Sequence, residues 1–127
     1  MIALDASAAV LALLNDGEAR RLVARENVAI PHLADSELTH ALRGQVRRGR
    51  IVEHQARAAL ARWARLGLHR FPAVGLLARV WELRDNLSAY DATYVALAEA
   101  LGCALVTADA RLAQAPGPTC AITVVRR

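Results

Sequence analysis

The chain has 127 residues, of which 55% are apolar, and its formal net charge is +4 at pH 7. This length predicts a single domain over residues 1–127, with enough apolar residues for a core. All 16 basic residues are arginines, and the absence of lysine excludes a P-loop nucleotide site, which requires one. The basic balance suits a nucleic-acid partner, but the same charge also serves solubility, so charge alone does not decide between the two.

The sequence argues against export and membrane insertion. Its apolar start, residues 1–14, is interrupted by Asp5 and lacks the basic segment and cleavage pattern of a signal peptide. No run approaches the ~18 apolar residues of a membrane span. Cys103 and Cys120 have neither metal-ligand spacing nor a disulfide framework, and a reduced cysteine in an apolar strand favours the cytoplasm. We therefore expect a cytoplasmic protein with no membrane contact.

Short apolar runs alternate with helical patterns along the whole chain. The expected strands are residues 2–4, 28–30, 68–71, 104–106 and 121–125. The expected helices are residues 7–14, 18–25, 33–48, 53–66, 73–83, 88–101 and 110–114. Uninterrupted apolar strands are typical of parallel sheets buried on both faces. Because right-handed crossovers place helices on both faces, the pattern predicts a three-layer α/β/α fold with about five, mainly parallel, strands.

Local signals predict several helix ends and buried positions. Ser7 is expected to cap the first helix, Gly49 to end the third and Gly67 to cap the fourth. Trp63 and Trp81 occur at the spacing of a helical core face. We expect them in the core or at a dimer contact and not as base-stacking platforms.

Four acidic residues fall at or near one edge of the predicted sheet. Asp5 ends the first strand and Asp109 follows the 104–106 strand, so both lie at carboxyl ends, where open parallel sheets bind ligands. Glu37 occupies the edge of the core-facing stripe of its helix, where an unpaired carboxylate is costly. Asp91 lies in the first turn of the 88–101 helix.

Each acid alone also has a structural explanation. Ser88 and Asp91 resemble a capping box, and Asp109 can cap the helix that follows it. Glu37 suits a paired side chain on the helix shoulder as well as a ligand. Asp5 has the weakest such explanation, because no arginine is adjacent to it. Together, four carboxylates from four segments would repel one another without a cation, and an all-oxygen set favours Mg²⁺ or Mn²⁺ over zinc.

Other titratable residues are expected to be structural. The histidines show no paired metal-ligand spacing and are expected at the surface or in loops; they are His32, His40, His54 and His69. Asp35, in the first turn of its helix, is expected to serve the helix dipole.

Four short motifs, in order along the chain, carry a family resemblance. They are Leu4-Asp5-Ala6-Ser7-Ala8, the stretch 31–38 (PHLADSEL), Tyr90-Asp91-Ala92 and the stretch 107–112 (TADARL). They resemble the PIN-domain family and, more closely, VapC, the toxin of bacterial VapBC toxin–antitoxin pairs. The resemblance covers essentially the whole chain, and its strength lies in the order of the motifs, because each motif is short.

The resemblance implies a Mg²⁺- or Mn²⁺-dependent endoribonuclease. The four acids of the family fall on Asp5, Glu37, Asp91 and Asp109, with Asp5 and Asp91 as direct metal ligands and the other two acting directly or through water. Thr107 matches a polar residue that orients the fourth acid or a water. In such a site, metal-activated water would attack the phosphodiester in line and leave a 3′-hydroxyl and a 5′-phosphate.

Two further features bear on this resemblance. Ser7 belongs to the first motif and is expected to support the site together with Thr107. Some relatives carry a further acid after the fourth, whereas Ala110, Arg111 and Leu112 follow here. The choice between one metal and two therefore stays open.

The implied partners are an RNA substrate, a VapB-like antitoxin and a second copy of the chain in a homodimer. Four arginines near the end of the helix that carries Glu37 could contact RNA or the antitoxin; they are Arg43, Arg47, Arg48 and Arg50. A solvated helix end favoured by the dipole explains these arginines equally well. Two other functions remain: an RNA-processing PIN nuclease without an antitoxin, and a weakly active binding module that works in a complex with a DNA-binding partner.

Overall fold

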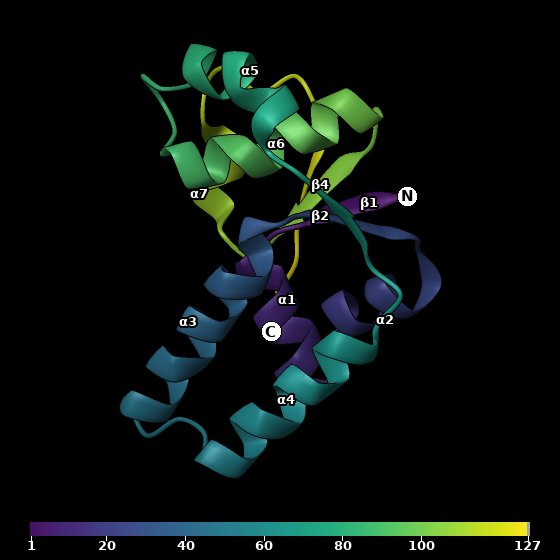
Figure 1. Ribbon diagram of the computed structural model, residues 1–127, viewed down its shortest axis with the longest axis vertical. Helices are drawn as coiled ribbons and strands as arrows, with labels where there is room; N and C mark the ends of the chain where they lie inside the picture. The colour runs from purple at the N-terminus through teal and green to yellow at the C-terminus, as the bar shows by residue number, and fades with distance from the viewer. Residues whose placement is uncertain (127) are drawn as a thin grey trace.

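Five parallel strands form the central layer of the molecule, for which a computed structural model describes residues 1–126 (Figure 1). They are β1 (Ile2–Leu4), β2 (Val28–Pro31), β3 (His69–Phe71), β4 (Ala104–Thr107) and β5 (Ile122–Val124). Their order is β3-β2-β1-β4-β5, and every neighbouring pair is parallel. The predicted parallel sheet is thus confirmed, while the last residue of the expected 1–127 domain lies outside the described residues.

Helices cover both faces of this sheet. One side carries α1 (Ala6–Leu14), α2 (Glu18–Arg25), α3 (Leu33–Arg47) and α4 (Glu53–Arg65). The other side carries α5 (Leu77–Glu82) and α6 (Ala89–Leu101), preceded by the 3₁₀ turn η1 (Val74–Leu76), while the short α7 (Ala110–Gln114) contacts β5. Figure 1 shows α5 and α6 above the strands, α1 below them, and α3 and α4 as a hairpin that extends away from the sheet. The three-layer α/β/α prediction is therefore confirmed.

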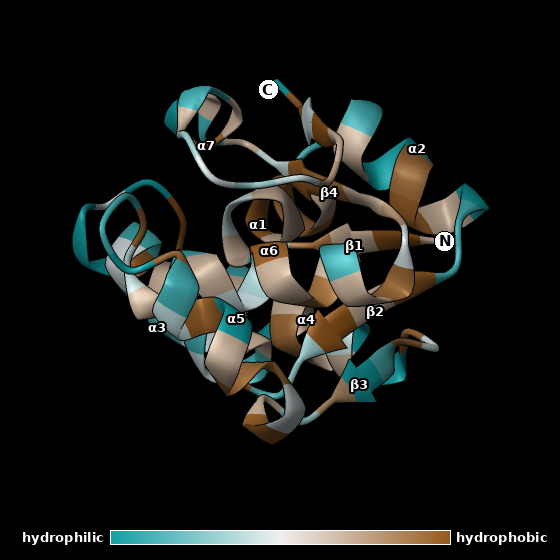
Figure 2. Cartoon of the chain, turned by 90° about the horizontal axis from the view of Figure 1, so that it is seen from above, coloured by the Kyte–Doolittle hydropathy of each residue, from teal (hydrophilic) through white to brown (hydrophobic). Residues whose placement is uncertain are grey.

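The central strands supply the apolar centre of the fold. Every residue of β1 and β2 is buried, and Figure 2 shows these strands as hydrophobic. The edge strand β3 is hydrophilic, with His69 and Arg70 exposed. Such charge on an edge strand discourages pairing with another sheet. Within residues 1–126, no helix has the length and apolar character needed to cross a membrane.

Three predicted helix boundaries require correction. Asp5, and not Ser7, caps α1, because its carboxylate accepts the backbone N–H of Ala8 at 3.0 Å. The helix α4 ends at Arg65 and is followed by extended Leu66, so Gly67 does not cap it. The predicted 73–83 helix is instead η1 followed by the six-residue α5. Gly49 does follow the end of α3, with φ of 71°.

The two tryptophans differ in their environment. Trp63 is 5% exposed, which confirms its core position. Its indole N–H donates to Asp35 Oδ1 at 2.7 Å, and Arg70 pairs with the same carboxylate at 2.9 Å. Asp35 lies in the first turn of α3, as predicted, and in addition it joins α3 to α4 and β3.

Trp81, in contrast, is 67% exposed, and Leu77 is 56% exposed. The core prediction was wrong for Trp81, which lies four residues after Leu77 and therefore on the same, exposed face of the short helix α5. The guanidinium of Arg84 lies 4.4 Å from the centroid of the exposed Trp81 ring. A dimer contact at Trp81 stays a prediction.

Two glycines provide opposite tests of this backbone. Gly44 lies within α3, and an added Cβ would meet only the mobile end of Arg48, with Nη1 at 2.8 Å. We expect Gly44→Ala to stabilise the protein by about 0.5–1 kcal/mol, because alanine restricts the unfolded chain and favours helix.

Gly102 ends α6 with φ of 63°, so Gly102→Ala should destabilise the protein by about 1–2 kcal/mol. Urea unfolding measures both, and a destabilising Gly44→Ala would contradict the proposed mobility of Arg48.

Candidate active site

Asp5 lies at the carboxyl end of β1 and is only 6% exposed. Its carboxylate accepts the Ser7 hydroxyl on Oδ1 at 2.6 Å and the Thr107 hydroxyl on Oδ2. The Ala8 N–H also donates to Oδ1, as the cap of α1. No arginine is adjacent to Asp5 in the sequence. Two hydroxyls and one amide bind its carboxylate instead, and they satisfy its oxygens without neutralising its charge.

The same two hydroxyls connect Asp5 to the loop after β4. Ser7 Oγ accepts the N–H of Ala108 at 2.9 Å, and Thr107 Oγ1 accepts the N–H of Asp109 at 3.0 Å. Each hydroxyl therefore accepts a hydrogen bond from one backbone N–H and donates a hydrogen bond to the Asp5 carboxylate. Because the loop is held at its backbone, the positions of Asp5 and Asp109 depend on each other.

Glu37 projects from the first half of α3 and is half-buried. Tyr94, on α6, donates its phenolic hydroxyl to Glu37 Oε1 at 2.6 Å. The ring of Tyr94 is 1% exposed, so this bond joins the two helix layers at the carboxyl edge of the sheet. Tyr94 lies three residues after Asp91 and therefore on the same face of α6; that spacing was the signal in the sequence that could have identified it.

Asp91 and Asp109 occupy the other side of this edge. Asp91 lies in the first turn of α6, where Ser88 caps the helix by accepting the Asp91 N–H at 3.1 Å. Asp109 caps α7 and is paired with Arg111, whose Nε and Nη2 each lie 3.1 Å from a carboxylate oxygen. The capping interpretation of the sequence is therefore confirmed for Ser88 and Asp109, and capping leaves the Asp91 carboxylate available for other contacts.

The charges of the four acids act on one another. Burial raises the pKa of Asp5, Glu37 and Asp91 above the usual carboxyl range. Neighbouring negative charge raises these pKa values further, from Asp109 at Asp5, from Asp91 and Asp5 at Glu37, and from Asp5 and Asp109 at Asp91. The structure thus brings the four predicted acids into one electrostatic cluster.

Asp109 differs from the other three acids. Its hydrogen bonds with Arg111 hold the pKa of its carboxyl below the usual range. Burial and the hydrogen bond to Glu37 raise the pKa of Tyr94, so this residue stays a neutral donor. Arg111, like Tyr94, was absent from the residues singled out in the sequence. Its position two residues after Asp109 was the available signal.

The donor chemistry of this cluster fits Mg²⁺ or Mn²⁺. It consists of carboxylate oxygens with raised pKa values, which a divalent cation would relieve. In residues 1–126, however, no three His, Cys, Asp or Glu side chains are close enough together to hold an ion as they stand. Asp5, Glu37 and Asp109 are each hydrogen-bonded to a partner of their own.

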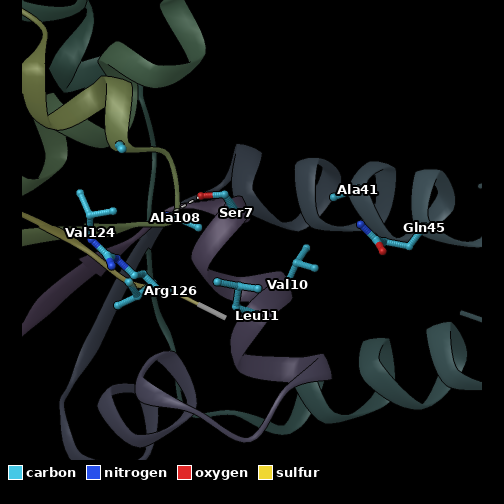
Figure 3. Close-up of a pocket in the computed structure, with 10 residues that line it drawn as sticks. Ser7, Val10, Leu11, Ala41, Gln45, Ala108, Val124 and Arg126 are labelled. Carbon is cyan, nitrogen blue, oxygen red and sulfur yellow. Dashed lines mark hydrogen bonds between the residues drawn. The ribbon is translucent and has the colours of Figure 1, made fainter. Parts of the chain in front are cut away.

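Two hollows border the cluster. A predominantly apolar one of about 520 Å³ lies between α1, α3 and the end of β5. Figure 3 shows Ser7 and Leu11 on its α1 side, Gln45 on its α3 side and Arg126 at the C-terminal end. A smaller, polar hollow of about 250 Å³ includes both Asp91 and Asp109. The acids thus lie beside both a polar recess and an apolar surface.

The predicted arginine contacts lie farther away. Arg43 and Arg47 are exposed on α3, and at 1.5 Å per residue they lie roughly 9 and 15 Å from Glu37 along the helix axis. Arg48 and Arg50, just beyond α3, are also exposed. Their contact with RNA or an antitoxin stays a prediction. All four histidines are exposed, as expected.

The raised pKa of Glu37 predicts a specific pH dependence of stability. The folded state holds this proton more tightly than the unfolded state, so stability falls as the pH rises from about 4.3, the unfolded value, through the higher folded value. We expect metal-free Glu37→Gln to unfold at a higher temperature than the wild type at pH 7, because glutamine still accepts from Tyr94 without the buried charge. The gain should shrink toward pH 4.

Thermal unfolding across pH measures this effect. Glu53→Gln is the control, since Glu53 is exposed and pairs only with Arg57 across one helical turn, and its loss should change stability little at any pH. A Glu37→Gln protein less stable than the wild type at pH 7 would contradict the electrostatic interpretation.

Several known proteins are similar to this chain in sequence or in fold. The PIN domain family model matches residues 2–118. Ribonuclease VapC9 of Mycobacterium tuberculosis is 58% identical over 127 residues, with both chains fully covered. The crystal structure of PAE2754 from Pyrobaculum aerophilum is 30% identical and matches with a TM-score of 0.71, covering 97% of this chain and 83% of that one. VapBC2 of Rickettsia felis, bound to a DNA fragment from its promoter, shares the fold at 16% identity and a TM-score of 0.71, covering 99% and 100% of the two chains. By its match to the family model and its full-length similarity to a VapC ribonuclease, the chain belongs to the PIN-domain family.

Proposed function

We propose that this chain is a metal-dependent endoribonuclease and the toxin of a toxin–antitoxin pair. The observation that carries the proposal is the cluster of four mutually interacting carboxylates at the carboxyl edge of the sheet, three of them with pKa values raised by burial and like charge. The full-length similarity to a VapC ribonuclease supports RNA as the substrate. A cluster of this kind is costly to the fold, which favours a functional role.

In this proposal, Asp5 and Asp91 hold Mg²⁺ or Mn²⁺, and Glu37 and Asp109 contribute directly or through water. When bound, such an ion would lower the pKa of water and offset the charge that builds up on the phosphate. Ser7 and Thr107 keep Asp5 in place through their hydrogen bonds. Tyr94 does the same for Glu37. No side-chain nucleophile is required, because water attacks the phosphodiester in line and leaves a 3′-hydroxyl and a 5′-phosphate.

The partner that we propose is a VapB-like antitoxin. The Rickettsia felis structure is a VapBC complex on promoter DNA, and this fold therefore occurs together with such a partner. In the present chain, the apolar hollow between α1 and α3 is suited to an apolar peptide segment that would also cover the acids beside Ser7. A homodimer, with Trp81 and Leu77 as apolar contacts, is also part of the proposal.

Metal binding and cleavage are tested on the same variant. We expect Mg²⁺ or Mn²⁺ to raise the unfolding temperature of the wild type and to support RNA cleavage. Asp91→Asn should lose the metal-dependent thermal shift and at least about 100-fold in cleavage rate, since changes one shell farther from a metal already cost 10–100-fold. Asp91 is suited to this test because its carboxylate, unlike that of Asp5, does not cap a helix.

The control is Asp85→Asn, which removes the same charge from an exposed position in the turn before α6. It should retain both the thermal shift and the activity. Full activity of a folded Asp91→Asn protein, or cleavage that persists in EDTA, would contradict the proposal.

Two alternative functions make different predictions. A weakly active binding module would show the thermal shift with metal but no RNA cleavage above that of the Asp91→Asn protein. An RNA-processing nuclease would cleave RNA but would lack a neighbouring gene for a DNA-binding antitoxin. Sequencing of RNA ends after induced expression would identify the cleaved RNA.

A further inference from the structure

Arg111 pairs with one acid of the cluster from an almost fully exposed position. Its guanidinium binds both oxygens of Asp109, with Nε and Nη2 each at 3.1 Å, and its own backbone N–H donates to Oδ1 at 3.0 Å. The side chain of Arg111 is 92% exposed, against 32% for Asp109. The guanidinium therefore lies at the rim of the site, between the acids and the solvent.

Helix stability does not explain this arginine. The helix dipole does not account for it, because α7 has only five residues and Arg111 belongs to its last turn as much as to its first. An ion pair this exposed also contributes little to stability, because water screens it and an ordered arginine loses rotamer freedom. The guanidinium can therefore leave Asp109 at small cost to the fold.

Arg111 lines the polar hollow that also holds two acids of the cluster. The polar hollow of about 250 Å³ is lined by Asn86, Ser88, Asp91, Asp109 and Arg111, among others. Arg111 holds the pKa of Asp109 below its usual range, and at Asp91 its positive charge opposes part of the rise in pKa that burial and the neighbouring acids cause. A phosphodiester that approaches the acids through this hollow meets the negative charge of both, and the guanidinium is the group there that attracts it.

We propose that Arg111 exchanges Asp109 for an RNA phosphate. In the free protein, the guanidinium of Arg111 is hydrogen-bonded to the Asp109 carboxylate. When RNA enters the polar hollow, the guanidinium leaves Asp109 and binds the phosphate beside the cleaved bond. The same movement frees Asp109 to turn toward Asp5 and Asp91. This inference rests on the proposed nuclease function, and it adds a substrate-binding residue and a reason for the separation of the acids in the free protein.

Guanidinium geometry suits this exchange. An arginine fork binds two oxygens of a carboxylate or of a phosphate with the same pair of parallel N–H groups. The exchange therefore breaks two charge-assisted hydrogen bonds and forms two of the same kind. Lysine cannot reproduce both bonds, so Arg111→Lys should keep the charge and lose part of the effect.

The test compares Arg111→Ala with Arg57→Ala. Arg57 is a matched control, because it is exposed and pairs with Glu53 on α4, away from the acids. Two quantities are measured: Mn²⁺ affinity without RNA, by calorimetry, and binding of a short fluorescein-labelled single-stranded RNA in EDTA as a function of salt. Both are independent of cleavage.

Arg111→Ala should bind Mn²⁺ about 2- to 5-fold more tightly than the wild type, the range expected when an exposed ion pair no longer competes. It should bind RNA more weakly. The negative slope of log affinity against log salt concentration should become shallower by about 0.7, the value for one phosphate contact on a single strand. Arg57→Ala should match the wild type in both measurements.

Two results would overturn the inference. Unchanged RNA affinity and salt slope in Arg111→Ala would show that the guanidinium does not contact phosphate. Weaker Mn²⁺ binding in that variant would show that Arg111 positions Asp109 for the ion instead of competing with the ion for its carboxylate. If wild-type protein bound no Mn²⁺ at all, the proposed function itself would fail, whereas normal Mn²⁺ binding with an unaffected Arg111→Ala protein would remove the inference about Arg111 alone.

Discussion

The buried carboxylate of Asp5 is the constraint on which the rest of the site depends. It ends β1 at the centre of the sheet, with β2 on one side and β4 on the other, and it is 6% exposed. Burial of a carboxylate without a counter-ion is costly unless its oxygens are satisfied. Here Ser7, Thr107 and the Ala8 amide satisfy them. The same hydroxyls hold the loop before Asp109, so a single charged group fixes the first strand, the first helix and the loop after β4 relative to one another.

The cost of this arrangement comes first from the burial of charged carboxylates, and repulsion between the acids adds to it. Burial and like charge raise the pKa values of Asp5, Glu37 and Asp91, and the hydrogen bonds from Tyr94 and the ion pair with Arg111 offset part of that cost. Stability lost at a site of this kind is typical of active centres, where charge is arranged for chemistry. We propose that these partners hold the carboxylates apart in the free protein and that a bound divalent cation would draw them together.

Much of the fold follows from the sequence, because short apolar runs such as 2–4 and 104–106 favour buried strands, and the helical patterns between them predict crossovers. The position of Asp5 and Asp109 at one sheet edge follows from the same topology. The exposed position of Trp81 could not be predicted, since the spacing of the apolar residues does not show which of them the six-residue α5 turns toward the core.

The partners of the acids were harder to predict from the sequence than the acids themselves. Tyr94 approaches Glu37 from 57 residues away in the chain, and the helix-capping role of Asp5 depended on the direction of its carboxylate after β1. Arg111 is close to Asp109 in the sequence, but charge alone does not distinguish a solvated arginine from one that is hydrogen-bonded to a carboxylate.

The central claim is that the four carboxylates form a cation site, and the most direct measurement is a crystal structure of the protein grown with Mn²⁺, with anomalous scattering recorded to locate the metal. The account predicts an anomalous peak at about 2.1 Å from carboxylate oxygens of Asp5 and Asp91, the distance typical of small divalent cations with oxygen ligands. Absence of a peak at the carboxyl edge of the sheet, with Asp5 still hydrogen-bonded to Ser7 and Thr107, would contradict it.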